Sequence, residues 1–319
     1  MVLVYIDQAD QQIKKASLEA LSYGAAIAKQ LGISTEALVL GTVQDDLTSL
    51  GKYGANKVHH LKNESLNSLD VKVHSTLIAA AAKNLNATIV VFAQNLNGRA
   101  IAPSVAVKLE AGIVTGACSL PNTANGFEVT KTVFSGKAFA HIKIETTIKV
   151  IAINQNSFGL VEYNASTTVE NIDLAIPAPS IKITKVEKIE GEIPLTEANL
   201  VVSGGRGLKG PENWGILLDL AKALGAATAC SRPVSDSDWR PHHEHVGQTG
   251  IQIAPNLYIA IGISGAIQHL AGVNRSKTIV VINKDPEAPF FKAADYGVVG
   301  DAFDIVPKLT AAVLKAKAN

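Results

Sequence analysis

The sequence predicts an α/β protein of two domains, each a doubly wound, mostly parallel sheet flanked by helices, with antiparallel strands added to the first domain. The chain has 319 residues, more than one ordinary hydrophobic core holds. Short apolar runs alternate with amphipathic stretches of helical length from the amino terminus onward. In the last third, five successive apolar runs end in glycine or polar residues, as strands do at the ligand-binding edge of a parallel sheet.

The first domain begins with strands and helices in alternation. In order, the pattern predicts a strand over Val2–Ile6, a helix over Ser17–Leu31 that ends at Gly32, strands over Glu36–Leu40 and Lys57–Leu61, a helix over Ser75–Leu85 and a buried strand over Ala87–Phe92. This alternation indicates a doubly wound sheet.

From Phe127 the segments become shorter and alternate between apolar and polar residues. We expect antiparallel strands at the edge of the first domain over Phe127–Phe134, Ala138–Ile144 and Lys149–Ile153. Proline and polar residues near 176–180 and around Pro194 then mark the passage to the second domain. We place the domains at residues 1–190 and 191–319.

The second domain contains the five strands whose ends are polar. They end at the turn Gly204–Gly207, at Ser231 and Arg232, at the turn Gly262–Gly265, at Asn283, and at Gly300 and Asp301. Helix starts and glycine turns at such an edge present backbone N–H groups to phosphates. The pattern therefore predicts a nucleotide site, with a pyrophosphate near Ser264. A helix is expected after Pro307.

Composition excludes several classes of protein. A net charge of +1 indicates no nucleic-acid partner, because surfaces that bind the phosphate backbone of a nucleic acid are strongly basic. No apolar run approaches the roughly 20 residues of a membrane span, and the chain opens directly into a strand, so we expect a cytoplasmic protein. His242, His243 and His245 around Glu244 follow Pro241 in an expected loop, and we interpret them as surface histidines and predict no metal site.

Five motifs closely resemble the flavin domain of electron-transfer flavoprotein alpha subunits of the bacterial type. They are SGGRGLKG at 203–210, SRPVSD at 231–236, VGQTG at 246–250, GISGAIQHLAG through NKDPEAP at 262–289, and ADYGVVGD at 294–301. The first domain matches more loosely, chiefly over Asn95–Ala117.

The resemblance implies one FAD in the second domain and a first domain that packs on an electron-transfer flavoprotein beta subunit. The resulting heterodimer would carry single electrons from a flavin-containing dehydrogenase to a downstream acceptor such as a quinone oxidoreductase, and would not turn over a substrate. The turn Gln94–Arg99 in the first domain is accordingly not expected to bind a nucleotide.

The resemblance also implies the residues that bind FAD. Ser203, Arg206 and Asn283 are expected near phosphates and ribose, and Asp301 near ribose or adenine. Arg232 is expected against the flavin ring and His269 near its O2 atom. Ala302 stands where relatives often have leucine, so we expect a backbone contact there. The full expected set is Ser203, Arg206, Ser231, Arg232, Val246, Gly247, Gln248, Thr249, Ser264, Gly265, Ala266, Ile267, Gln268, His269, Asn283, Asp301 and Ala302.

Two other functions fit parts of the pattern. An NAD(P)-binding oxidoreductase subunit is the main alternative, because Asp285 follows the glycine turn at about the spacing of a ribose-binding acid. A non-redox nucleotide-binding protein built on the first domain is the third. It would leave Arg232, Thr249 and His269 without a role.

Overall fold

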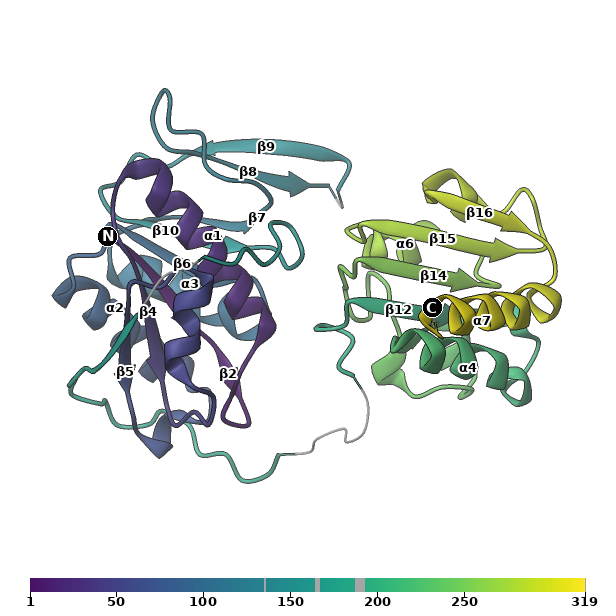
Figure 1. Cartoon of the computed structure of the whole chain (residues 1–319), viewed down its shortest axis with the longest axis horizontal. Helices are drawn as coiled ribbons and strands as arrows, with labels where there is room; N and C mark the ends of the chain where they lie inside the picture. Colours follow the sequence, from purple (N-terminus) through teal and green to yellow (C-terminus); the bar gives the residue numbers. More distant parts are fainter. Residues whose placement is uncertain (135, 164–166, 187–192, 319) are drawn as a thin grey trace. The chain divides into compact units, whose positions relative to one another are not determined.

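The computed structural model describes residues 1–134, 136–163, 167–186 and 193–318, and the chain divides into two compact units, residues 1–187 and 188–319. The predicted boundary between residues 190 and 191 lies outside the described residues. Each unit has its own sheet and its own core (Figure 1).

The first unit is built on a sheet that has nine strands within the described residues, in the order β11-β5-β4-β1-β6-β10-β7-β8-β9. All neighbours from β11 to β7 are parallel, and β8 and β9 are antiparallel. The strands are β1 (Val2–Ile6), β4 (Thr35–Leu40), β5 (Lys57–Leu61), β6 (Ile89–Ala93), β7 (Gly112–Ala117), β8 (Glu128–Val133), β9 (Ala138–Lys143), β10 (Lys149–Ile153) and β11 (Thr168–Asn171). A two-stranded ribbon, β2 (Gln8–Ala9) and β3 (Gln12–Ile13), follows β1.

Helices cover both faces of this sheet, as predicted. Helix α1 (Lys15–Leu31) packs on the face of Val2 and Val4, and α2 (Val71–Asn84) and α3 (Leu96–Lys108) pack on the face of Leu3. Helix α1 ends at Gly32, whose φ of 66° is the left-handed conformation that glycine adopts without strain. Short 3₁₀ helices, η1 (Leu47–Tyr53) and η2 (Glu64–Leu66), flank β5.

Two expectations for the first unit are wrong. Strand β10 is not an antiparallel addition at the edge: it runs parallel between β6 and β7, and its residues from Val150 to Ile153 are buried. A continuous apolar run is typical of a central parallel strand, and its place between two earlier strands depends on contacts distant in sequence. The second is the turn predicted over Gln94–Arg99, because most of it belongs to α3, which Asn95 caps by accepting from the Gly98 amide.

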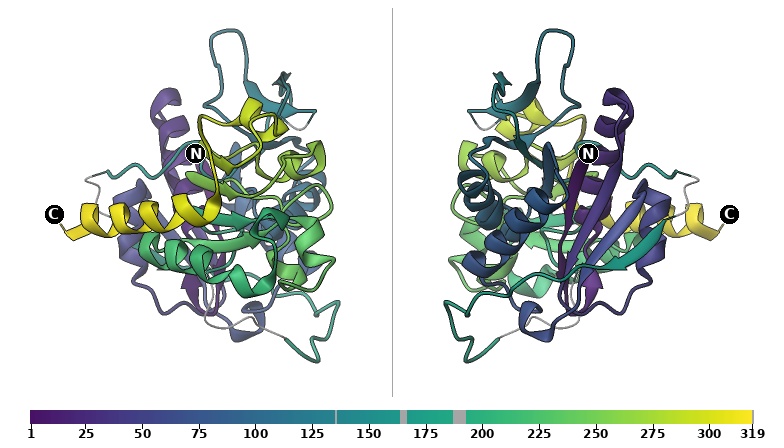
Figure 2. Two further views of the ribbon diagram at one scale, coloured as in Figure 1. Left: turned by 90° about the vertical axis from the view of Figure 1, so that its right-hand side faces the viewer. Right: turned by 90° about the vertical axis from the view of Figure 1, so that its left-hand side faces the viewer.

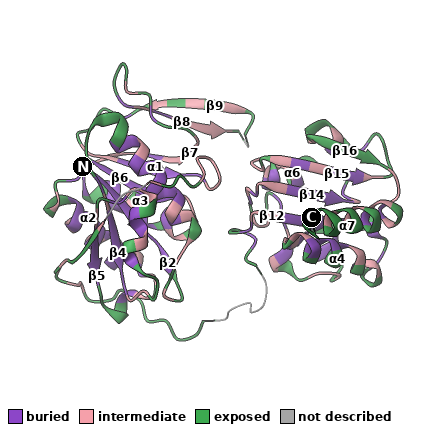
Figure 3. Cartoon of the chain, viewed as in Figure 1, coloured by how far each residue is buried: buried purple, intermediate pink, exposed green. Residues whose placement is uncertain are grey.

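Within its described residues, 193–318, the second unit has a five-stranded, fully parallel sheet in the order β13-β12-β14-β15-β16. Its strands are β12 (Leu200–Gly204), β13 (Ala227–Cys230), β14 (Leu257–Ile261), β15 (Thr278–Asn283) and β16 (Tyr296–Val299), and all five predicted strands are confirmed. The order reverses between β12 and β14, and open sheets of this kind bind ligands at that point. Strand β16, unlike the buried inner strands, is exposed (Figure 3).

Helices again cover both faces. Helices α4 (Gly215–Leu224) and α7 (Ala302–Ala318) lie side by side on one face (Figure 2), and α6 (Ile267–Val273) and the 3₁₀ helix η6 (Pro289–Ala293) lie on the other. The remaining helical segments are α5 (Arg232–Ser235), η3 (Arg206–Leu208), η4 (Pro211–Asn213) and η5 (His242–Glu244). Helix α7 starts before Pro307, where we expected it to begin, because the Asp301 carboxylate accepts from the Phe303 amide and caps it at Ala302.

Candidate functional site

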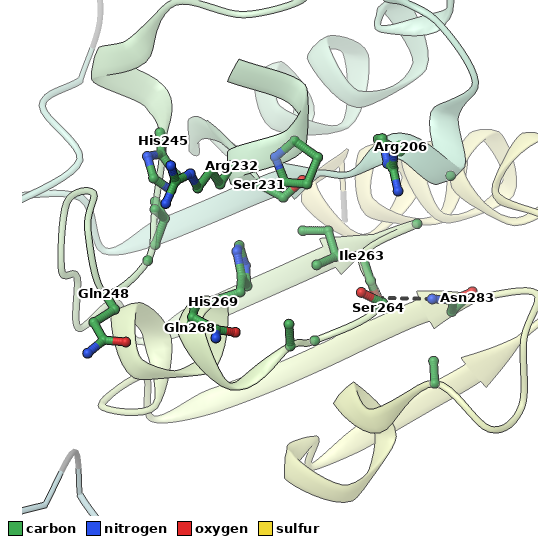
Figure 4. A pocket seen from close by; sticks show the side chains of 18 of the residues that line it. Arg206, Ser231, Arg232, His245, Gln248, Ile263, Ser264, Gln268, His269 and Asn283 are labelled. Atoms are coloured by element: carbon green, nitrogen blue, oxygen red, sulfur yellow. Dashed lines mark hydrogen bonds between the residues drawn. The ribbon is translucent and has the colours of Figure 1, made fainter. Parts of the chain in front are cut away.

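A cavity of about 540 Å³ lies at the carboxyl edge of the second sheet (Figure 4). Its walls come from the ends of β12, β13, β14 and β15 and from the loop between η5 and β14. Thirteen of the residues predicted from the sequence line it: Arg206, Ser231, Arg232, Val246, Gly247, Gln248, Thr249, Ser264, Gly265, Ala266, Gln268, His269 and Asn283.

Glycines let the loops after β12 and β14 meet at the floor of the cavity. The Gly205 amide donates to the Ile261 carbonyl over 2.9 Å, and the Gly207 amide donates to the Gly262 carbonyl over 3.0 Å. A Cβ atom on Gly205 would lie 2.3 Å from the Gly262 oxygen, and one on Gly207 would lie 2.5 Å from the Gly262 Cα. A side chain at either position would force the two loops apart and close the space between them.

The turn after β14 has its own backbone requirements. Gly262 has a φ of 62° and Gly265 a φ of 80°, both in the left-handed region. A Cβ atom on Gly265 would lie 2.4 Å from the Phe290 Cβ. Helix α6, which follows the turn, has only seven residues. The close packing of the turn, rather than a long helix, therefore determines the shape of this wall.

Asn283 links the end of β15 to this turn. Its side-chain nitrogen donates to the Ile263 carbonyl over 3.0 Å, and its side-chain oxygen accepts from the Asp285 amide over 3.1 Å. The side chain was predicted to reach phosphates and ribose, and in this structure it holds the cavity wall together. Asp285, which suggested NAD(P), also lines the cavity, and its carboxylate accepts from the Glu287 amide over 3.0 Å.

The end of β13 contributes Ser231 and Arg232. Ser231 is buried and its amide donates to the Gly204 carbonyl over 3.0 Å. The Arg232 side chain is 62% exposed, and its Nε lies 3.2 Å from the Asp236 carboxylate, four residues along the chain. One side of the guanidinium is thus oriented by Asp236 at the rim of the cavity.

Residues Val246–Thr249, in the loop before β14, form another wall of the cavity. The Gln248 amide donates to the Gln268 carbonyl over 2.7 Å, which ties the loop to α6. A Cβ atom on Gly272 would lie 2.5 Å from the Gly247 Cα, so the loop crosses the helix backbone in direct contact. The matched glutamines and glycines therefore occupy one continuous wall.

Two imidazoles face this part of the cavity. His269 is buried, and burial together with the nearby His245 lowers its pKa to about 4. Burial and the positive charge of Arg232 lower the pKa of His245 as well. Both rings are therefore neutral at pH 7. Neutral rings leave Arg206 and Arg232 as the fixed positive charges of the cavity among the described residues that line it.

Four predicted residues do not line the cavity. Ser203 is fully buried beneath it, on the α6 face of the sheet, because alternate residues of a strand point to opposite faces. Ile267 is exposed, and Ala302, the first residue of α7, is buried in the core that this helix covers. Asp301 caps α7 and lies 4.0 Å from the Lys209 ammonium.

The structure adds lining residues that were absent from the predicted set. His245, interpreted above as a surface histidine, is half-buried in the wall, directly before the Val246–Gly250 motif. Its place next to a recognised motif was the available signal. The others are Gly207, Pro233, Gly262, Ile263, Asp285 and Ala288, most of them neighbours of predicted residues.

These features fit FAD. The glycine contacts between Gly207 and Gly262 leave backbone exposed to a pyrophosphate, and Arg206 and Arg232 offer charge to phosphate and to the flavin ring. The Nδ1 atom of His269 is buried in this wall and forms no hydrogen bond of normal geometry with the described residues.

The fold and the cavity define a nucleotide-binding α/β protein whose ligand lies at the edge of a parallel sheet. Two family models match the chain: the electron transfer flavoprotein domain over residues 2–178 and the electron transfer flavoprotein FAD-binding domain over residues 194–274. The chain belongs to the electron transfer flavoprotein family, among the relatives of its alpha subunits, and its cofactor is FAD.

Relatives match along nearly the whole chain. The electron transfer flavoprotein subunit alpha of Bacillus subtilis (strain 168) is 36% identical, over 97% of this chain and 96% of its own length. That of Syntrophomonas wolfei is 36% identical, over 98% of both. A probable mitochondrial alpha subunit of Caenorhabditis elegans is 35% identical, over 98% of this chain and 93% of its own. In the part of the chain that the structure describes, no helix is both long and apolar enough to cross a membrane.

Proposed function

We propose that this chain is the alpha subunit of a heterodimeric electron-transfer flavoprotein. Its bound FAD would pass single electrons from a flavin-containing dehydrogenase to a downstream acceptor such as a quinone oxidoreductase, without turnover of a substrate. The partner would be an electron-transfer flavoprotein beta subunit, on which the first domain packs. The family of the chain and the names of its relatives support this proposal.

One observation supports the proposal above the others: the matched residues of four motifs line a single cavity at the reversal of strand order. Arginine side chains, a neutral imidazole and backbone amides are binding groups. They can hold a cofactor, orient its ring and bias its charge, because a fixed cation favours forms that gain negative charge on reduction. FAD supplies the electron transfer itself when bound.

The expected roles of the side chains follow from their positions. We assign phosphate contacts to Arg206, Ser264 and the glycine turn, and contacts with the flavin ring to Arg232, Gln248, Thr249, Gln268 and His269. Asp301 and Ala302 lie outside the cavity wall but at the start of α7, beside Lys209, and we assign them to the ribose and adenine end. The proposal excludes Ser203 from direct contact, since its hydroxyl is buried.

The test is co-expression of the chain with the beta subunit encoded in the same genome, followed by spectroscopy and potentiometry. We expect a yellow 1:1 complex with one FAD, and a reduction curve whose first phase has the slope of a one-electron couple, about 59 mV per tenfold change in ratio. A colourless complex that binds NADH would support the NAD(P) alternative instead. A complex that is reduced only in a two-electron step would contradict single-electron transfer.

A further inference from the structure

A buried aromatic cluster lies behind the cavity wall. It consists of Tyr258 on β14, His269 on α6 and Phe290 on η6. The ring centroids of Tyr258 and His269 are 6.1 Å apart, and His269 meets Phe290 edge to face at 5.7 Å. Tyr258 and Phe290 are fully buried, and His269 alone of the three also lines the cavity. The cluster can therefore fix the orientation of this imidazole without touching a ligand.

One hydrogen bond in the cluster involves a ring nitrogen of His269. The Tyr258 hydroxyl lies 2.7 Å from Nε2, in a buried environment. Burial raises the pKa of the Tyr258 phenol far above its usual value, so the hydroxyl stays protonated and can donate a hydrogen bond. His269 is neutral, since burial lowers its pKa to about 4, and a neutral imidazole has one N–H and one acceptor nitrogen. If the phenol donates, Nε2 is the acceptor and Nδ1 carries the ring proton.

The surroundings of Nδ1 favour the same arrangement. Nδ1 is buried and forms no hydrogen bond of normal geometry with the described residues, and the Val246 backbone raises the His269 pKa, as a carbonyl that accepts from a ring N–H does. A proton on Nδ1 would face that acceptor. The opposite arrangement, with the proton on Nε2, would place the bare Nδ1 lone pair against a carbonyl oxygen.

From this geometry we propose that Tyr258 is a positioning residue, which holds His269 as a neutral imidazole with its proton on Nδ1 and fixes the ring in the cavity wall. The consequence for FAD rests on the proposed function: a fixed tautomer would present the flavin with one constant pattern of hydrogen-bonding atoms. Tyr258 itself does not line the cavity.

Ser203 lies close to Tyr258, on the side away from the cavity. It lies on the face of the sheet that carries Tyr258, because Val201 is paired with Tyr258 and Ser203 with Ala260. The Ser203 hydroxyl is buried without a hydrogen bond of normal geometry, and as a hydrogen-bonding group beside the phenol it lowers the Tyr258 pKa against the larger effect of burial. This position gives a structural reason for a polar residue at 203, although Ser203 does not line the cavity.

The first test reads the tautomer directly in the wild-type chain in complex with its partner. Selective ¹⁵N labelling of the eight histidines gives ring signals whose two-bond ¹H–¹⁵N pattern distinguishes Nδ1–H, Nε2–H and the doubly protonated ring. Comparison with His269→Gln assigns the signal. We expect the Nδ1–H pattern at pH 7, both with FAD and after its removal. An Nε2–H or doubly protonated ring at His269 overturns the proposal, whether or not a Tyr258 variant folds.

The second test uses Tyr258→Phe, with Tyr296→Phe as the control, because the Tyr296 side chain is 67% exposed on β16 of the same domain. Loss of the donor should abolish the Nδ1–H signal and weaken FAD binding by roughly 2- to 12-fold, the range for one lost hydrogen bond. The control should change neither. A Tyr258→Phe complex that keeps the wild-type tautomer and FAD affinity would overturn the proposal. A wild-type complex that binds no FAD would instead overturn the proposed function, while the tautomer result would stand.

Discussion

The amide of Gly207 donates to the carbonyl of Gly262 over 3.0 Å, and this contact joins the two loops at which the strand order of the second sheet reverses. The two glycines come from motifs more than fifty residues apart in the sequence. Their backbones meet because neither has a Cβ atom, and the cavity lies directly above the contact.

Gly262→Ala should therefore damage both stability and FAD binding. A Cβ atom would lie 2.8 Å from the Gly207 Cα, and the φ of 62° strains any residue other than glycine. We expect unfolding of the second domain to become easier by about 2 kcal/mol or more and FAD affinity to fall at least tenfold. Gly215→Ala is the control, since nothing lies within 4 Å of its added Cβ atom. Equal behaviour of the two variants would show that the loops do not need this close contact.

The buried ion pair between Arg240 and Glu244 should support the loop that precedes His245. The Glu244 side chain is 1% exposed, and its carboxylate accepts from Nε of Arg240 over 2.9 Å. Glu244→Gln removes the negative charge of this pair and keeps the size of the side chain, so it should lower the free energy of unfolding by about 1–3 kcal/mol.

The two tryptophans of the chain, Trp214 and Trp239, both lie in the second domain, so fluorescence during denaturation follows this domain alone. Trp214 also stacks with Arg240, whose guanidinium carbon is 5.9 Å from the ring. Glu287→Gln, at an exposed position, serves as the control. A loss no larger for Glu244→Gln than for this control would contradict the assigned role.

The strands of the second sheet could be predicted from the pattern of apolar residues in the sequence. All five strands and the edge at which they end were predicted, because each strand is a local apolar run followed by a turn. Strand β10 was misplaced because its neighbours are β6 and β7, and only contacts distant in sequence determine that a run comes between earlier strands. A local pattern contains no such information.

The residues of the candidate site also divide into those that a local sequence pattern places correctly and those that it does not. Motif residues in turns, such as Gln248 and Ser264, line the cavity, since turns at strand ends project into it. Ser203 lies inside a strand, and the period of two turns its side chain to the buried α6 face. The partnership of His269 with Tyr258 joins residues eleven positions apart on different elements, and its geometry depends on the packing of Phe290.

A segment of the first domain should respond to acid through Asp70. Its carboxylate caps α2 and accepts from both the amide and the hydroxyl of Ser180, at 2.6 and 2.8 Å. Burial alone would raise its pKa, but the hydrogen bonds from Ser180 and from the first turn of α2 outweigh burial and lower the pKa to about 2. The stabilisation is thus complete above the ordinary pKa of about 4 and is lost as pH falls toward 2.

Ser180→Ala should raise the Asp70 pKa toward its ordinary value and shift acid-induced release of the 172–180 segment to higher pH. Carboxyl ¹³C titration by NMR measures the pKa, and hydrogen exchange at the Ile172 amide, which donates to the His60 carbonyl, follows the segment. Ser65→Ala is the control, because the Ser65 hydroxyl donates to the side chain of Asn63, which caps another helix, η2. An Asp70 pKa that does not move would show that Ser180 is not its partner in solution.

The stability of the second domain should also depend on pH through His269. Its folded pKa of about 4 lies below the ordinary value of 6.5, so the unfolded chain takes up a proton first as pH falls. Stability is then full above pH 6.5 and decreases between pH 6.5 and 4, by up to about 3 kcal/mol. His269→Gln should remove the part of this slope that comes from His269 and leave the part that comes from His245, whose pKa is also lowered. Tryptophan fluorescence at fixed denaturant across that range is the measurement, and an identical slope in wild type and variant would refute the assignment.

The last prediction concerns Arg232 at the cavity rim. Its permanent charge should favour the reduced, more negative forms of the flavin, so Arg232→Ala should lower the first reduction potential. A charge-assisted hydrogen bond of about 1.5 kcal/mol corresponds to roughly 65 mV for one electron, and solvent screening of this 62% exposed side chain reduces the expected shift to about 20–65 mV. Arg232→Lys keeps the charge and should shift the potential less. Asp236→Asn frees the guanidinium from the carboxylate 3.2 Å away and should raise the potential. Potentiometric titration of the four complexes with FAD bound measures this series, and an unchanged potential in Arg232→Ala would mean that the guanidinium does not face the flavin.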